Sequence, residues 1–123
     1  MFSIRVERVF SAAHGITIGG VNEPLHGHDW RVRVTIESGT LDDDGMVCDF
    51  HALEKSLDGI LSPLQNSNLN ETPPFDELNP TAENVAFHIA RSMQPELPAT
   101  VTSITASVTE APGCEARCRL ERS

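Results

Sequence analysis

Apolar and polar residues alternate along two long segments in the first third of the chain. The even positions of residues 2–14 are mostly apolar, and those of residues 26–37 form an unbroken apolar series: Trp30, Val32, Val34 and Ile36. Alternation is typical of a strand with one buried face, because successive side chains point to opposite sides of a sheet. We therefore predict two strands here, with a bulge near Arg8 or Val9 where the first pattern is interrupted. A loop rich in glycine and asparagine, residues 19–24, connects them.

A spacing of three or four residues replaces this alternation in the middle of the chain and predicts two helices. The first covers residues 51–61, with Asp49 as its N-cap and Pro63 just beyond its end. Its apolar stripe comprises Phe50, Leu53, Leu57, Ile60 and Leu64. The second begins after its N-cap, Thr81, and ends before Pro95. Its stripe comprises Val85, Ile89 and Met93.

Further strands are predicted on both sides of these helices. A turn at residues 42–45 precedes a short strand over residues 46–50, and strands over residues 100–110 and 116–121 follow the second helix. Strands paired as hairpins, with two helices between them, imply one α+β domain spanning residues 1–123. We expect an antiparallel sheet with both helices on one face.

The charge, apolar segments and cysteines of the chain limit which partners and which cellular location we expect. The net charge is −9, and an acidic surface repels phosphate backbones, so we expect no nucleic-acid partner, although a local pocket can still bind a small anion. No segment approaches the ~20 apolar residues of a membrane helix, and the N-terminus lacks the apolar core of a signal peptide. We expect a cytoplasmic protein without membrane contact. Three cysteines, Cys48, Cys114 and Cys118, predict reduced thiols rather than a disulfide framework.

Three histidines predict a metal site. His26 and His28 lie two residues apart in a strand, so both imidazoles project from one face, and His14 closes the first strand at the same parity. If the two strands are neighbours, the three imidazoles converge into a common zinc donor set with a fourth position left open. The alternative interpretation is that these histidines only cap an apolar face. His51 and His88 lie outside this set, and we interpret both as structural.

Five segments, in this order and spacing, resemble the 6-pyruvoyl-tetrahydropterin synthase and 6-carboxy-tetrahydropterin synthase family. They are Phe10–His14, Leu25–Trp30, Gly45–Phe50, Asn79–Asn84 and Val108–Glu110. The resemblance implies the tunnelling fold: a four-stranded antiparallel sheet with two helices on one face. It also implies that three subunits close a barrel, that two such rings form a homohexamer, and that active sites lie between subunits.

The resemblance also implies roles for particular residues. Zinc would bind His14, His26 and His28, and a pterin would be anchored by Glu110. A carboxylate suits that task, because the pyrimidine edge of a pterin carries adjacent N–H donors that two carboxylate oxygens accept side by side. Thr81 would contribute to the pterin site of a neighbouring subunit through its backbone, in addition to capping its own helix.

The chain departs from the family at its catalytic positions. Asn22 stands where the family has a cysteine four residues before the first histidine of the His-Gly-His motif, and Gln65 and Asn66 replace an aspartate-histidine pair. Amides do not titrate near neutral pH and cannot shuttle protons as a thiolate or an imidazole can. Glu23, three residues before His26, resembles a variant subgroup in which a glutamate replaces the cysteine and the enzyme cleaves the side chain of dihydroneopterin.

Three hypotheses follow from this pattern. The first is a pterin-binding member of the family with a three-histidine zinc site and altered or lost synthase activity. The second is a zinc-dependent lyase that acts on dihydroneopterin or its triphosphate, with Glu23 as general base. The third is a non-catalytic assembly protein with a relict pocket.

Overall fold

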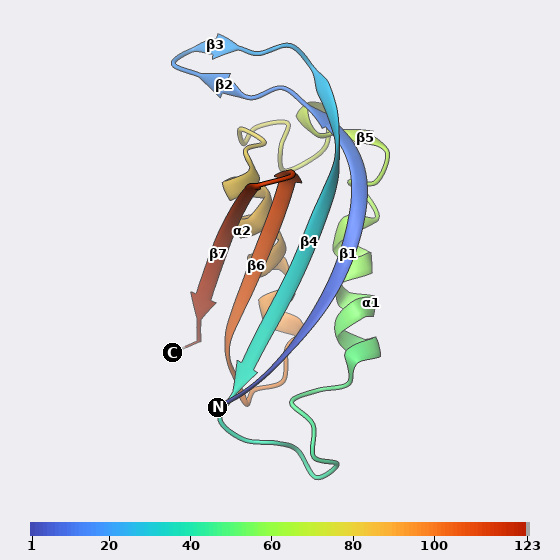
Figure 1. Ribbon diagram of the computed structural model, residues 1–123, viewed down its shortest axis with the longest axis vertical. Coiled ribbons are helices and arrows are strands. Elements are labelled where there is room, and N and C mark those ends of the chain that lie inside the picture. Colours follow the sequence, from blue (N-terminus) through green and yellow to red (C-terminus); the bar gives the residue numbers. More distant parts are fainter. Residues whose placement is uncertain (123) are drawn as a thin grey trace.

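The computed structural model describes residues 1–122 and shows one sheet with two helices packed on one of its faces (Figure 1). The sheet has five strands in the order β5-β1-β4-β6-β7. Their bounds are β1 Phe2–His14, β4 His26–Ser38, β5 Ser67–Asn68, β6 Val101–Ala111 and β7 Cys114–Glu121. The predicted α+β class and the four antiparallel strands are confirmed. The predicted total of four strands is wrong, because the short β5 pairs in parallel with β1.

The ladder between β1 and β4 runs unbroken through all 13 residues of β1 and ends at the pair His14–His26. The bulge predicted near Arg8 or Val9 is therefore wrong. Arg8 keeps the even register, which faces the helices, and its guanidinium reaches two carboxylates of α1 (Phe50–Leu61). These carboxylates belong to Glu54 and Asp58, both 2.8 Å away. The ion pairs let a charged residue occupy an apolar register position.

Both helices begin at the predicted caps. The Asp49 carboxylate accepts the N–H of His51, and the Thr81 hydroxyl accepts the N–H of Asn84 at the start of α2 (Ala82–Met93). In α1 the buried residues are Leu53, Leu57 and Leu61. Phe50, which we had assigned to the apolar stripe, is 52% exposed. In α2 the predicted stripe of Val85, Ile89 and Met93 is buried, and a 3₁₀ turn, η2 (Gln94–Glu96), follows it.

The segment before α1 is a turn followed by an irregular stretch. The Asp42 carboxylate accepts the N–H groups of Asp44 and Met46, and Gly45 adopts a φ of 79°, so the predicted turn is confirmed. The strand predicted over residues 46–50 is wrong, because none of the described strands pairs with this segment. Of its apolar side chains, Val47 is buried, at 5% exposed.

The segment between β1 and β4 forms a small hairpin rather than only a loop. Its strands are β2 (Thr17–Ile18) and β3 (Val21–Asn22), joined at Gly19 and Gly20. Both glycines have positive φ, 57° and 80°, as the tight turn between two such short strands requires. The hairpin projects beyond the end of the sheet (Figure 1). A second 3₁₀ turn, η1 (Leu69–Glu71), follows β5.

The core lies between the helices and the even-numbered face of the sheet. Trp30 and Phe10 stack across β4 and β1 with their ring centroids 5.7 Å apart, and both are almost fully buried. The odd-numbered residues of β1, β4, β6 and β7 form the opposite face, which neither helix covers (Figure 1). Within residues 1–122, no helix has the length and apolar character needed to cross a membrane.

Candidate metal centre

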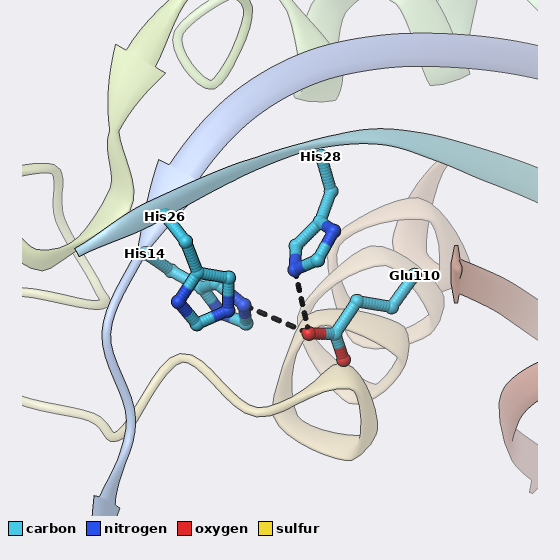
Figure 2. Close-up of side chains that lie close together, drawn as sticks. All are labelled: His14, His26, His28 and Glu110. Atoms are coloured by element: carbon cyan, nitrogen blue, oxygen red, sulfur yellow. Dashed lines mark hydrogen bonds and ion pairs between the residues drawn. The ribbon is translucent and has the colours of Figure 1, made fainter. Parts of the chain in front are cut away.

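The three predicted histidines converge at one end of the sheet (Figure 2). His14, the last residue of β1, pairs with His26, the first residue of β4, and His28 projects from the same face of β4 two residues further on. The ring centroids of His14 and His26 are 4.7 Å apart, those of His26 and His28 4.8 Å, and those of His14 and His28 5.2 Å. The predicted convergence is confirmed, and it follows directly from the register of two long antiparallel strands.

Backbone carbonyls fix the tautomers of two of these rings. His14 Nδ1 lies 2.8 Å from Pro80 O, and His26 Nδ1 lies 2.9 Å from Pro24 O. A carbonyl oxygen only accepts, so each Nδ1 carries the proton and donates it. In the neutral form of both rings, Nε2 then carries a lone pair. Such carbonyl contacts to the second ring nitrogen are characteristic of histidines that bind metals.

Glu110 is the fourth member of the cluster. One of its oxygens, Oε1, lies 2.9 Å from His14 Nε2 and 3.0 Å from His28 Nε2. Ligand atoms of the three histidines and Glu110 all lie within 4.8 Å of one another. Sequence reasoning treated Glu110 as a pterin anchor and did not predict its contact with the histidines.

Glu110 has the parity of Ile104, Ala106 and Val108 in β6, so its side chain lies on the core side of the sheet. Thr109 pairs with Glu115 and Ala111 pairs with Cys114, so Glu110 has no opposite residue on β7. The regular pairing of β6 with β7 is interrupted here by a bulge. The carboxylate of Glu110 faces the core side of the sheet, where the histidines lie.

The donor set fits a divalent cation. A lone pair on His14 Nε2 faces a carboxylate oxygen, and this contact is repulsive unless a proton or a cation lies between them. His28 Nε2 is buried and has no aligned hydrogen bond, although it is 3.0 Å from Glu110. A buried ring nitrogen without an aligned partner is costly, whether it donates or accepts. Three imidazoles and a carboxylate are ligands that zinc accepts in a tetrahedral site.

Aromatic and apolar groups shield one side of the cluster. His14 and Trp30 are both 0% exposed, and their rings meet edge to face with centroids 4.7 Å apart. The Trp30 indole N–H donates to Ala12 O at 3.2 Å, which fixes the orientation of this wall. Low water access strengthens electrostatic interactions with any bound ion.

Glu23 lies beside the cluster. Its Oε1 is 3.7 Å from His26 Nε2 and also accepts the N–H of Ile16 at 3.2 Å. The backbone N–H of Glu23 donates to Ile16 O at 2.9 Å. The carboxylate is thus held within reach of a group bound at the histidines, while its side chain remains one third exposed.

Two asparagines that sequence reasoning did not select hold this end of the sheet together. The Asn70 amide accepts from Gly15 N and donates to Gly15 O, and the Asn79 amide does the same for Thr17. Gly15 allows a close approach, because a Cβ at this position would lie 2.7 Å from Glu23 O. In the sequence, the feature that could have predicted this close approach is the glycine directly after His14. These contacts fix the backbone of the residues that directly follow His14.

The three replaced catalytic positions lie outside the cluster. Asn22 is exposed on the β2–β3 hairpin, where its amide oxygen accepts from the Thr17 hydroxyl. Gln65 accepts from Ser11 N, and Asn66, at a φ of 58°, donates its N–H to Ser11 O. These residues connect the loop after α1 to β1.

The other predicted residues have local partners. Thr81 caps α2, and its backbone N–H donates to Asn79 O at 2.8 Å, so its predicted contribution to a neighbouring pterin site stays a prediction. His51 is solvent-exposed beside Glu54, and His88 packs edge to face on Phe75. Burial lowers the pKa of His88. Both lie outside the cluster, as predicted.

The three cysteines are free thiols, as expected: Cys48, Cys114 and Cys118. Burial raises the pKa of Cys48, and carboxylates nearby raise it further. Burial also raises the pKa of Cys118. Both thiols are therefore protonated at neutral pH and are weak nucleophiles.

A hollow of about 340 Å³ adjoins Glu110 on the side away from the histidines. The start of α2 and the first residues of β7 line it, through Ala82, Glu83, Cys114, Glu115, Ala116 and Arg117. The second carboxylate oxygen of Glu110 points away from the imidazoles (Figure 2). Glu110 therefore separates the histidine cluster from an open space at the edge of the subunit.

Comparisons with known proteins agree with this geometry. The dihydroneopterin monophosphate aldolase of Pyrococcus furiosus is 37% identical over 92 residues, which are 75% of each chain. The solved structure of 6-pyruvoyl tetrahydropterin synthase from Plasmodium falciparum superimposes with a TM-score of 0.84 at 20% identity and covers 98% of both chains. The Plasmodium vivax synthase superimposes with a TM-score of 0.81 at 19% identity over 98% of both chains, in a variant that replaces a glutamate described as a catalytic residue by alanine.

A family-wide comparison covers almost the whole chain. The sequence profile described as 6-pyruvoyl tetrahydropterin synthase matches residues 3–121. The match includes all four residues of the cluster and both helices. The chain is a member of the 6-pyruvoyl tetrahydropterin synthase family.

Proposed function

We propose that this protein is a metal-dependent lyase that cleaves the side chain of a dihydropterin of the dihydroneopterin type. The observation that carries the proposal is the position of Glu23, whose carboxylate is held 3.7 Å from His26 Nε2 at the rim of the histidine cluster. A carboxylate beside a metal-bound hydroxyl is placed to act as a general base. The similarity to an archaeal dihydroneopterin monophosphate aldolase supports the same reaction.

Glu110 and the hollow beside it would bind the pterin ring. His14, His26 and His28 would hold zinc through their Nε2 lone pairs, so that they no longer compete for the Glu110 carboxylate. Both oxygens of Glu110 could then accept the adjacent N–H donors of the pyrimidine edge. This arrangement places the ring on the hollow side of Glu110 and the side chain toward the histidines.

The bond changes follow from this placement. Glu23 removes the proton of the 2′-hydroxyl, the C1′–C2′ bond breaks, and C2′ leaves as an aldehyde. The electron pair of the broken bond passes to C1′ and into the ring C6=N5 bond, and C1′ then takes up a proton. The products are 6-hydroxymethyl-dihydropterin and glycolaldehyde or its phosphate. When bound, zinc would polarise the side-chain hydroxyls and lower their pKa.

The replaced positions argue against the usual synthase reaction. Asn22, Gln65 and Asn66 carry amides, and all three are engaged in hydrogen bonds within the chain. The lyase reaction proposed here needs one base, and Glu23 supplies it. Its precedent within the fold is the Plasmodium vivax synthase, in which a glutamate is described as a catalytic residue.

A product assay tests the lyase reaction. Zinc-loaded protein is incubated with dihydroneopterin and with its monophosphate and triphosphate, and the aldehyde fragment and 6-hydroxymethyl-dihydropterin are quantified. We expect Glu23→Gln to lower kcat by about 10²–10⁴-fold and to leave pterin affinity unchanged. Glu96→Gln is the matched control, because Glu96 is exposed in η2, at the end of α2 opposite to Pro80 and Thr81. Wild-type release no faster than that of Glu23→Gln would refute the proposal.

A pterin-binding protein without turnover is the second candidate. The substitutions at Asn22, Gln65 and Asn66 favour it, because they remove titratable groups while the cluster and Glu110 are kept. Saturable pterin binding that Glu110→Ala abolishes, without any side-chain release, would support this candidate over the lyase. Absence of both metal and pterin binding would favour the assembly role.

We also propose that subunits associate through the edges of the sheet to form the hexamer that the family resemblance implies. Within residues 1–122, β7 has no strand on its outer side, and β1 is covered there only by the two residues of β5. Unpaired edges offer rows of N–H and C=O groups to another strand. Light scattering tests this: a monomeric mass at micromolar concentration would rule the hexamer out.

A further inference from the structure

The open face of the sheet carries polar side chains in ordered rows. In one row Arg5, Thr35, Thr105 and Arg119 face one another across the four long strands. In the next row the corresponding residues are Glu7, Arg33, Ser107 and Arg117. Hydroxyl side chains therefore occupy much of the centre of this face, and arginines flank them. Five of the nine basic residues of this acidic chain lie on this face: Arg5, Arg31, Arg33, Arg117 and Arg119.

These rows enclose a pocket of about 200 Å³. Its lining consists of three arginines, three hydroxyl residues and one glutamate: Arg5, Arg33, Arg117, Thr35, Thr105, Ser107 and Glu115. The pocket therefore has an excess of positive charge in a protein whose net charge is −9. A local positive potential of this kind attracts anions independently of the net charge.

Two donors in this pocket are buried without an aligned hydrogen bond. They are Arg33 Nε and the Ser107 hydroxyl. Arg33 Nε is 3.3 Å from Glu7 Oε1, but the carboxylate of Glu7 is directed to Arg31, which donates to it at 3.0 Å. Within the described part of the chain, Arg5 forms no ion pair at all. Both donors have a carboxylate nearby but no aligned hydrogen bond, so each can still donate to an acceptor from outside the chain.

We propose that this pocket binds a phosphate-type oxyanion. Guanidinium groups and hydroxyls are the donors that such an anion needs. They converge from different strands around a compact, multiply charged acceptor. Arg33 Nε and the Ser107 hydroxyl would donate from the floor. Arg5 and Arg117 would close on the anion from the two sides.

Glu115 lowers the affinity of this pocket for an anion. Its carboxylate accepts from Arg117 at 3.0 Å and lies 3.6 Å from Arg33, so it neutralises part of the charge. Arg117 lowers the pKa of Glu115 most, and the Ser107 hydroxyl lowers it further, although no aligned hydrogen bond joins the two side chains. The carboxylate therefore competes with an anion for the same donors. Removing its charge should strengthen binding.

The pocket is separate from the metal centre. The lining residues have odd numbers and lie on the open face, whereas His14, His26, His28 and Glu110 lie on the side of the sheet that faces the helices. Anion binding therefore does not depend on the proposed lyase reaction. Glu115 and Arg117 line both this pocket and the hollow beside Glu110, whereas Arg5 and Arg33 line only the pocket, so variants of Arg5 and Arg33 test it alone.

Isothermal titration of full-length protein with inorganic phosphate and with pyrophosphate, at constant ionic strength in chloride, tests the proposal. We expect one site per chain, and binding about tenfold weaker or more in Arg33→Ala and in Arg5→Ala. Arg5 is exposed, so Arg5→Ala keeps the test valid if Arg33→Ala does not fold. Glu115→Gln should bind about threefold more tightly. Arg91→Ala changes net charge equally but lies on α2, and we expect wild-type affinity.

Three results would overturn the proposal: no saturable binding at millimolar anion, unchanged affinity in both Arg5→Ala and Arg33→Ala, or an equal loss in Arg91→Ala. A parallel titration with a nucleoside diphosphate distinguishes the sources of the phosphate. Affinity equal to that of pyrophosphate assigns recognition to the phosphates alone, and tighter binding shows that the base also contributes. Unchanged phosphate affinity in Glu110→Ala would confirm that the pocket is independent of the pterin site.

Discussion

His14 Nε2 lies 2.9 Å from Glu110 Oε1, although 96 residues separate the two in sequence. The contact joins the end of β1 to a bulge in β6 across the intervening β4. Because His14 Nδ1–H donates to Pro80 O, the contact of Nε2 with Glu110 is favourable only with a second proton on the imidazole, a proton on the carboxylate, or a cation. The metal proposed for the histidines would relieve this competition and free Glu110 for a ligand.

Removing one imidazole should abolish metal binding. We expect purified wild type to take up about one zinc per chain, and His14→Ala or His28→Ala to lose it. Zinc at about 100 times its Kd should raise the free energy of unfolding of wild type by about 2.7 kcal/mol and leave both variants unchanged. Elemental analysis and denaturation with and without zinc measure these effects. His51→Ala is the control, since His51 is exposed, and equal zinc in all four proteins would contradict the assignment.

Glu110 should determine pterin affinity. We expect Glu110→Gln to weaken binding of neopterin by about tenfold to a hundredfold, because an amide keeps one acceptor and loses the charge. Glu83→Gln is the matched control, because Glu83 lines the same hollow but does not contact the histidines. Calorimetry on zinc-loaded protein gives both affinities. Equal binding by the two variants would show that Glu110 belongs only to the metal centre.

A methyl group at residue 15 should disturb the site. The Cβ of Gly15→Ala would lie 2.7 Å from Glu23 O, and this atom belongs to the backbone, so the chain must shift. We expect a loss of about 1–3 kcal/mol in the free energy of unfolding and a larger relative loss of any lyase activity. Gly27→Ala lies between His26 and His28, and its Cβ would meet nothing within 4 Å. Denaturation of both variants is the measurement, and a Gly15→Ala protein as stable as Gly27→Ala would contradict it.

His88 should make stability depend on pH. Burial lowers its folded-state pKa below the ordinary value of 6.5, so the unfolded chain binds a proton at higher pH than the folded chain does. The free energy of unfolding contributed by His88 is therefore present above pH ~6.5 and is lost as the pH falls through the folded pKa. Urea denaturation measures this effect: between pH 7.5 and pH 5.5 the free energy of unfolding should fall less for His88→Gln than for wild type. A difference of the opposite sign would refute this account.

The positions that the sequence predicts well are those governed by regular periodicity. His14, His26 and His28 were assigned to one face because strand parity fixes it, and the caps Asp49 and Thr81 were identified from local chemistry. The predicted bulge near Arg8 failed, because parity alone does not reveal that α1 supplies carboxylates to a charged residue on the core side.

Other features depend on contacts between distant segments and leave no local pattern. The bulge at Glu110 depends on how β6 pairs with β7 just before the turn that joins them. The two residues of β5 are too few to show a period, and the role of Asn70 appears only when Gly15 lies beside it. The contact of Glu110 with the histidines belongs to this class, because it depends on the side-by-side arrangement of β1, β4 and β6.

The hydrogen bond from His14 to Pro80 has a consequence for the behaviour of the whole chain. The residue after Pro80 is Thr81, whose hydroxyl accepts the N–H of Asn84 in the first turn of α2. A ligand that immobilises His14 therefore also restrains the loop on which this helix begins. Metal binding should therefore slow amide hydrogen exchange at Asn84. Exchange in the first turn of α2 would then report whether the site on the sheet is occupied.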